Sequence, residues 1–376
     1  MSNQIKAAVL NQLNGDFELE TLNLASTLSP HEVKVHIVAS GICHTDEAVR
    51  NGQGGDYPYP GVVGHEGAGI VEEVGSAVRS CKPGDHVILC YDYDGYCKNC
   101  LDGRPAACFN WNKLNMEGFN AEGKTPFSRD DGTEVHNFFN QSSFATETIV
   151  DDRNVTVVGD DIDLRKVGPL GCGFVTGSGT VFNALQPKVG SAIVIFGTGA
   201  VGLGALMAAK ITGCNTLICV DVVGHRLETA KKIGATHIIN SKEEDPVKKI
   251  KEITNGGVDY AIDTTGISPV MTQAFESLTS GGKFAPVAVT RHEFKIEHPF
   301  ADLTSYQKSV IGVLMGDAVP QKSIPQLIEF WQAGKFPFDT LEEFYSLDQI
   351  NQANADSNSG KVIKPVLIID EDYKPE

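Results

Sequence analysis

Hydrophobic and polar positions follow two different rhythms along the chain. In the first 170 residues, short apolar runs bounded by glycine predict β-strands at residues 5–10, 33–41, 67–74 and 86–90. After Gly171 the apolar runs are separated by segments of helical length and period. Such alternation is typical of a parallel sheet with helices on both faces. We therefore predict an α/β protein, in which a doubly wound parallel sheet follows a mainly β region.

The strand and helix pattern also predicts how the chain divides into domains. The second region is expected to contain strands at 192–196, 217–221, 237–240, 260–263 and 283–289, and helices at 200–212 and 226–233. Beyond about residue 315 the alternation stops, and a helix at 320–331 and a last strand at 366–369 are expected to return to the first region. We expect one domain at 1–173 with 316–376 and another at 174–315, with two long loops at 52–61 and 110–137.

The composition excludes several classes of function. The chain of 376 residues is 41% hydrophobic and 21% charged, which is ordinary for a globular enzyme. Its formal charge of -17 opposes binding to nucleic acid or to an anionic membrane. Neither a membrane span nor a signal peptide is indicated by the apolar runs. We expect a cytoplasmic protein whose partners are small molecules.

A glycine motif predicts a dinucleotide site. Gly197, Gly199 and Gly202 form GxGxxG between a predicted strand and helix, where helix amides can bind a pyrophosphate. Asp221 ends the next strand, where a carboxylate can accept hydrogen bonds from the adenine ribose and would repel a 2′-phosphate. NAD is therefore favoured over NADP, although Arg226 nearby keeps NADP open. The alternative is an ordinary glycine turn that Asp221 caps.

A group of cysteines predicts a metal site. Three of the nine cysteines follow the spacing Cys97-x2-Cys100-x7-Cys108, and a reducing cytosol would keep them as thiols. A structural zinc site needs four ligands, and Asp94 continues the x2 spacing, so we take its carboxylate as the fourth. A loop without metal, with three free thiols, is the alternative.

Three further segments carry metal-ligand residue types without a telling spacing. They are Cys43-His44-Thr45-Asp46, Gly64-His65-Glu66 and Gly171-Cys172-Gly173. Taken alone, a buried cysteine or a single histidine is usually a structural residue. These segments by themselves therefore do not predict a metal site.

Together, these motifs closely resemble the medium-chain, zinc-dependent alcohol dehydrogenase family. Its members carry a G-[IV]-C-[HR]-[ST]-D segment, a G-H-E segment, a cysteine loop, a G-C-G segment and GxGxxG, and all five occur here in that order. The resemblance extends over essentially the whole chain. It implies a GroES-like catalytic domain beside a Rossmann domain, two zinc ions per chain, NAD, and a homodimer or homotetramer.

The resemblance also implies roles for individual residues. Cys43, His65 and Cys172 would bind a catalytic zinc ion, Asp46 would orient His65, and Glu66 would stand behind the metal. Thr45 would accept the proton of the alcohol. Coenzyme contacts would come from His44, Thr176, Arg226 and Lys364, and the substrate pocket would be lined by Tyr91, Phe138 and Cys90.

Two departures from the family pattern affect these roles. Members usually carry a cysteine where this chain has Asp94, and many carry a histidine three residues after the Thr45 position, where this chain has Ala48. We therefore hypothesise that His44 carries the proton onward from Thr45.

The finer resemblance is to aryl-alcohol (benzyl alcohol) dehydrogenases, through residues 43–46, 137–144 and 334–339. The implied reaction transfers a hydride between a primary or aryl alcohol and NAD. Dehydrogenases of S-(hydroxymethyl)glutathione, polyols or terpenoid alcohols are the alternatives within the family. A catalytically silent coenzyme-binding protein and a zinc-ribbon nucleic-acid module are alternatives of other classes, and the retained ligand set and the acidic charge respectively argue against them.

Overall fold

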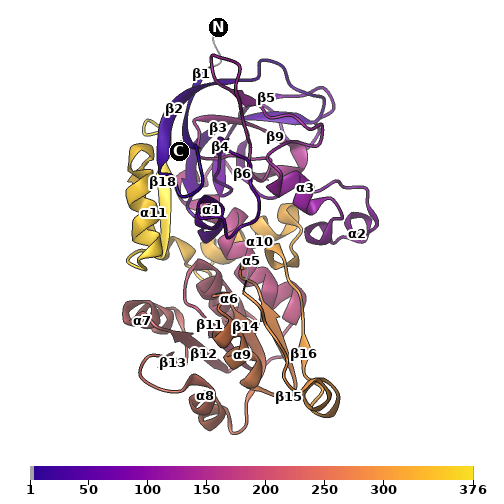
Figure 1. The fold of residues 1–376 in the computed structure, drawn as a ribbon, viewed down its shortest axis with the longest axis vertical. Helices are drawn as coiled ribbons and strands as arrows, with labels where there is room; N and C mark the ends of the chain where they lie inside the picture. Colours follow the sequence, from indigo (N-terminus) through magenta and orange to yellow (C-terminus); the bar gives the residue numbers. More distant parts are fainter. Residues whose placement is uncertain (1–3, 291, 376) are drawn as a thin grey trace. The chain divides into compact units, whose positions relative to one another are not determined.

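The computed structural model describes residues 4–290 and 292–375, which divide into two compact units. The first unit consists of the chain up to Cys172, Val319–Gln326 and the chain from Asp339 onward. The second unit consists of Gly173–Ala318 and Leu327–Phe338. Figure 1 shows the elements of each unit along the coloured chain.

The first unit is built on two sheets. One has the strand order β4-β1-β2-β7-β8, with bounds Gly61–Val62, Gln4–Leu10, Phe17–Leu24, Phe127–Ser128 and Glu134–Val135. The other has the order β10-β6-β5-β3-β18-β17, with β9 also paired to β3, and its bounds are Val155–Val158, His86–Leu89, Gly67–Val74, Glu32–Gly41, Lys364–Ile368, Glu342–Ser346 and, for β9, Glu147–Asp151. The first unit is therefore mainly β.

Strand β3 organises the second of these sheets. Its first residues alternate between partly exposed and buried, and its last five are all buried, as expected for a strand that runs from an edge into a core. It pairs antiparallel with β18, which comes from the C-terminal segment of the chain. Strand β17 pairs in turn with β18 and sets Glu342 opposite Lys364.

The second unit has a single parallel sheet with the order β13-β12-β11-β14-β15-β16. The bounds are His237–Asn240, Thr216–Asp221, Ala192–Phe196, Val258–Asp263, Leu278–Pro286 and Ser309–Val310. The central strands are apolar and buried almost throughout because helices cover both faces of such a sheet. This sheet and the mainly β first unit confirm the predicted fold class.

The helices mostly connect strands. Those of the first unit are α1 (His44–Arg50), α2 (Lys98–Leu101), α3 (Trp111–Met116), α4 (Leu164–Val167) and α11 (Ile350–Asn358). Those of the second unit are α5 (Gly173–Gly179), α6 (Ala200–Ile211), α7 (Gly224–Ile233), α8 (Pro246–Thr254) and α9 (Ser268–Glu276). The predicted helix at 320–331 is α10 (Pro320–Gln332).

The two units differ from the predicted ranges chiefly in Leu327–Phe338, which belongs to the second unit. The rings of Phe336 and Phe338 pack at 6.2 and 5.3 Å from that of Phe174, so they are part of its core. The sequence pattern did not indicate this because the strand and helix alternation has already ended there.

Two further features of the fold concern the cysteines and the helices. All nine cysteines are free. No helix within residues 4–290 and 292–375 combines the length and apolar character that a membrane crossing requires.

Candidate metal centres and coenzyme site

Three ligand residues that lie far apart in the sequence meet in the first unit. Ligand atoms of Cys43, His65 and Cys172 all lie within 4.8 Å of one another, and the two sulfurs are 4.0 Å apart. Cys43 directly precedes α1, His65 precedes β5, and Cys172 is the last residue of the first of the three segments that make up the first unit. Two thiols and an imidazole form a donor set suited to zinc.

Asp46 holds the imidazole of His65 in one orientation. Its Oδ1 lies 3.0 Å from Nδ1 of His65 and accepts a hydrogen bond from the Gly64 amide, while Oδ2 accepts one from the Cys43 amide. The other ring nitrogen, Nε2, is buried and has no hydrogen-bond partner among the described residues. A buried ring nitrogen without a hydrogen-bond partner is expected of a metal ligand, because the metal ion would be its partner.

The two thiols differ in acidity. The pKa of Cys43 lies well below its usual range because the Cys172 thiol donates a hydrogen bond to its sulfur, against the effect of burial, and because His65 lies beside it. Thiolates are the form that binds zinc. The hydrogen bond to Cys43 and burial raise the pKa of Cys172 well above its usual range, so Cys43 is the thiol of the pair that is prepared to lose its proton.

The proposed proton acceptor and relay residue follow Cys43 on α1. Thr45 Oγ1 lies 3.7 Å from the sulfur of Cys43. His44 is exposed, and Ala48, on the same helix, is fully buried. The structure therefore places a hydroxyl at the candidate metal centre and an imidazole beside it at the surface.

Glu66 and Lys364 form a buried ion pair next to these ligands. The Lys364 ammonium lies 2.8 and 3.0 Å from the two oxygens of Glu66 and also donates to the Ile42 carbonyl. Glu66 has room only because residue 41 is glycine, since a Cβ there would lie 2.0 Å from Glu66 Oε2. Lys364, which was predicted to contact the coenzyme, is buried and pairs with Glu66, and its contact with the coenzyme stays a prediction.

The three residues predicted to line the substrate pocket are all fully buried. The ring of Phe138 lies edge-on to His65, with centroids 5.4 Å apart. Tyr91 packs against Tyr93 and Trp111, and the Cys90 thiol donates to the Gly171 carbonyl. Phe138 therefore contacts a candidate metal ligand.

The cysteine loop forms a second cluster. Ligand atoms of Asp94, Cys97, Cys100 and Cys108 lie within 4.8 Å of one another, which is the full set of four predicted from the spacing. The sulfur of Cys97 lies 3.5 Å from that of Cys100 and 4.0 Å from that of Cys108. Four donors at these separations fit a closed tetrahedral site.

The carboxylate of Asp94 is held in place by hydrogen bonds. Oδ1 accepts from the amides of Tyr96 and Cys97, and Oδ2 accepts from the side chain of Asn110, each at 2.9 Å. Although burial alone would raise it, these bonds hold the pKa of Asp94 well below its usual range. The carboxylate of Asp94 is therefore ionised and oriented so that it could bind a metal ion together with the three thiols.

The glycine motif has the geometry of a phosphate-binding turn. Gly197 has φ +90°, and a Cβ on Gly202 would lie 1.9 Å from the Gly197 carbonyl oxygen. At Gly199, the first residue before α6, an added Cβ would meet nothing within 4 Å, so the turn is open on that side. A pyrophosphate could approach the helix amides there.

The carboxylate of Asp221 accepts hydrogen bonds both from the glycine turn and from the residues that follow it. Oδ2 accepts from the amide and hydroxyl of Thr198, and Oδ1 accepts from the amides of Val222 and Val223. Arg226, on α7, lies near this carboxylate, and burial lowers the pKa of the Arg226 guanidinium.

The hydroxyl of Thr176, on α5, lies 3.9 Å from the sulfur of Met315.

A third cluster, which the sequence did not indicate, does not resemble an available metal site. His36, Glu72 and Glu147 offer ligand atoms within 4.8 Å of one another. However, the ammonium of Lys34 lies 2.9 and 2.6 Å from the two carboxylates. It occupies the place that a cation would need.

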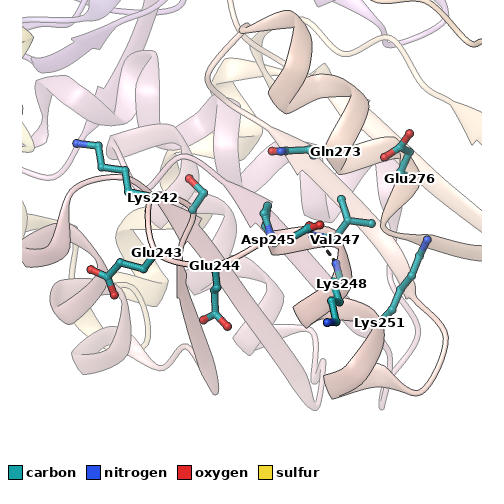
Figure 2. Close-up of a pocket in the computed structure, with 11 residues that line it drawn as sticks. Lys242, Glu243, Glu244, Asp245, Val247, Lys248, Lys251, Gln273 and Glu276 are labelled. Carbon is teal, nitrogen blue, oxygen red and sulfur yellow. Dashed lines mark hydrogen bonds between the residues drawn. The ribbon is translucent and has the colours of Figure 1, made fainter.

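The second unit has an open depression of about 700 Å³ beside α8. Figure 2 shows its lining, which consists of side chains of the loop before α8 and of α8 itself, together with Gln273 and Glu276 of α9. No predicted site residue is among the residues that line it. Its mixed charges do not converge on a point, so it indicates no particular ligand.

Two family models match most of the chain between them. The model described as "Alcohol dehydrogenase GroES-like domain" matches residues 29–160, and that described as "Zinc-binding dehydrogenase" matches residues 200–333.

Individual relatives match nearly the full length. The chain is 39% identical over 365 residues to the geraniol dehydrogenase of Castellaniella defragrans, covering 96% of this chain and 97% of that one. It is 33% identical to the S-(hydroxymethyl)glutathione dehydrogenase of Paracoccus denitrificans, covering 96% and 99%. The crystal structure of benzyl alcohol dehydrogenase from Acinetobacter calcoaceticus superposes with a TM-score of 0.92 at 43% identity, covering 97% and 99%.

Proposed function

Because the chain belongs to the zinc-dependent medium-chain alcohol dehydrogenase family, we propose that it oxidises primary or aryl alcohols with NAD as the hydride acceptor. The reverse reaction reduces the aldehyde or ketone. The observation that carries the proposal is the convergence of Cys43, His65 and Cys172, with His65 Nε2 buried and without a hydrogen-bond partner in the described part of the chain.

In this proposal the two sulfurs and His65 Nε2 hold a catalytic zinc ion. A zinc ion held there would act as a Lewis acid and lower the pKa of the alcohol hydroxyl, as zinc lowers that of bound water from about 16 to about 7. Asp46 keeps Nδ1 of His65 occupied, so that Nε2 remains the ligand atom.

The remaining residues move the proton and shape the site. Thr45 Oγ1, beside Cys43, accepts the proton of the alcohol, and the exposed His44 passes it to solvent. The ammonium of Lys364 compensates the negative charge of Glu66, so the carboxylate does not add an unpaired buried charge beside the two thiolates. The apolar ring of Phe138 excludes water next to His65.

We place a structural zinc ion on Asp94, Cys97, Cys100 and Cys108. The support is the compact donor set and the three hydrogen bonds that orient the carboxylate. This ion would stabilise the loop without taking part in the reaction.

For the coenzyme, the glycine turn would bind the pyrophosphate, and the carboxylate of Asp221 would accept the adenine ribose hydroxyls. An anion at this point repels a 2′-phosphate, which supports NAD. Arg226 near Asp221 is the feature that would soften this preference.

The substrate class is supported by the benzyl alcohol dehydrogenase structure and by the aromatic surroundings of His65. The similarity to geraniol and S-(hydroxymethyl)glutathione dehydrogenases favours a terpenoid alcohol or the glutathione adduct as second candidates.

We further propose a homodimer or homotetramer in the cytoplasm. Strand β16 lies at the edge of the parallel sheet, and Phe300 and Tyr306, which precede it, are 75% and 53% exposed. Exposed edges and apolar side chains of this kind are usually covered by a partner.

Metal analysis combined with a substrate panel tests the proposal. We expect two zinc ions per chain, loss of turnover after complete chelation, and a higher kcat/KM for benzyl alcohol with NAD than with NADP. Geraniol and S-(hydroxymethyl)glutathione test the second candidates in the same assay. Normal turnover by fully metal-free protein would overturn the proposal.

A further inference from the structure

The imidazole of His65 packs against two buried phenylalanines. The ring of Phe139 stacks on it with centroids 4.6 Å apart and an interplanar angle of 28°, and the ring of Phe138 meets it edge-on. The bond to Asp46 restrains one ring nitrogen, whereas a stacked neighbour restrains the tilt of the ring plane. The direction in which His65 Nε2 points therefore depends on where Phe139 lies.

The backbone around Phe139 is strained. Phe139, Asn140 and Ser142 have φ of 56°, 46° and 49°, in the left-handed region that side chains disfavour. Such conformations persist where surrounding contacts over-determine them, and they cluster at functional sites.

Buried hydrogen bonds hold this strained turn. Asn140 donates to the carboxylate of Asp92, Asn154 donates to the Phe139 carbonyl, and Ser142 bonds both Phe138 N and the Val62 carbonyl. The turn is thus fixed from several sides, and so is the ring that it presents to His65.

Helix α3 connects Phe139 to the cysteine loop. The Phe139 amide donates to the Asn115 carbonyl, and the Trp111 ring stands perpendicular to that of Phe139 at 5.5 Å. Just before α3, Asn110 donates from its amide to the Cys108 sulfur and from its side chain to Asp94. Both of these hydrogen bonds go to members of the proposed loop metal site.

We propose that Phe139 is a positioning residue for His65 and that α3 ties it to the cysteine loop, so that metal in the loop raises the affinity for metal at Cys43, His65 and Cys172. The inference rests on the proposed function, because it assumes metal at both clusters. Coupling between two binding sites is reciprocal, so metal at either cluster should strengthen binding at the other by the same factor.

The first experiment replaces the ring that stacks on His65. In full-length protein loaded with Co²⁺, Phe139→Leu is expected to shift the visible d–d bands of the catalytic site and to speed chelator-driven release of that ion about three- to tenfold. Phe144→Leu is the matched control, because Phe144 is a buried phenylalanine of the same segment that packs on Phe17. Phe139→Tyr retains the ring and should restore the spectrum.

The second experiment perturbs the loop without removing a ligand. Asn110→Ala keeps all four donors, and we expect it to speed release from the catalytic site as well as from the loop. In the Phe139→Leu background, this effect on the catalytic site should disappear. Cys43→Ser identifies which absorption bands belong to the catalytic site.

Unchanged spectra and release rates in Phe139→Leu, or equal changes in Phe144→Leu, would overturn the inference. That result leaves the proposed function standing, because the wild-type protein still binds the ion. Failure of the wild-type protein to bind Co²⁺ or Zn²⁺ at Cys43, His65 and Cys172 would instead refute the proposed function itself.

Discussion

Lys364 and Glu66, which lie 298 residues apart in the chain, form an ion pair that is almost completely buried. Burial raises the pKa of Glu66, while the ammonium of Lys364 opposes that rise, and the carboxylate in turn raises the pKa of Lys364 despite burial. Each charge is tolerated in the core because the other compensates it.

Removing one partner should therefore be costly. In zinc-loaded protein, Lys364→Met is expected to lower the free energy of unfolding by about 3–5 kcal/mol, because it leaves the Glu66 carboxylate buried without a counter-ion. Lys361→Met is the control, since the ammonium of Lys361 is exposed where it pairs with Asp356, and its removal should lower the free energy of unfolding far less. Denaturant unfolding measures both, and equal small losses would contradict the assignment.

Glu342 should make stability depend on pH. Burial first, and then Asp339, raises its pKa from 4.5 to about 9, against the effect of Lys364 and Lys166 and with a further increase from Glu66. Neither carboxyl oxygen has a hydrogen-bond partner among the described residues. The folded protein therefore keeps this carboxyl protonated where the unfolded chain has lost the proton.

The free energy of unfolding should therefore fall as the pH rises. Folding takes up a proton at Glu342 between pH 4.5 and about 9. Below pH 4.5 this group does not reduce the free energy of unfolding, and the reduction grows as pH rises through this window. Glu342→Gln should be more stable than the wild type by a few kcal/mol, of order one per pK unit, at pH 8 to 9, and the two should converge near pH 4. Glu343→Gln, at the exposed neighbour, should show no such pH-dependent gain in thermal unfolding.

Asp94 should limit how tightly the cysteine loop holds zinc. Asp94→Cys supplies a fourth thiolate and is expected to slow zinc release to a chelator, whereas Asp94→Ala should lose about one zinc ion per chain. Stoichiometry by elemental analysis, together with thiol accessibility, measures both. Asp102→Asn, at an exposed position just after α2, is the control. Retention of two zinc ions by Asp94→Ala would exclude Asp94 as a ligand.

His44 should affect proton release rather than coenzyme binding alone. Because Ala48 offers no acid or base, we expect His44→Gln to lower kcat about tenfold near neutral pH and to flatten the pH profile of turnover. His31→Gln, another partly exposed histidine of the first unit, should leave the profile unchanged. A normal profile in His44→Gln would show that the proton takes another route.

The sequence by itself determined the features that depend on local order. The alternation of strands and helices, the glycine turn after β11 and the spacing of the cysteine loop were all legible, because period and short spacing are properties of neighbouring residues. Asp94 was found as a member of the loop cluster for the same reason.

Only the tertiary structure decided which distant residues meet. Cys43 and Cys172 are 129 positions apart, and the pairing of β18 with β3 and of β17 with β18 is what sets Lys364 beside Glu66 and Glu342 beside Lys364. The stacking of Phe139 on His65 likewise depends on a strained turn and on α3. Strand register and burial create these contacts, and neither is encoded in the spacing of the residues that take part.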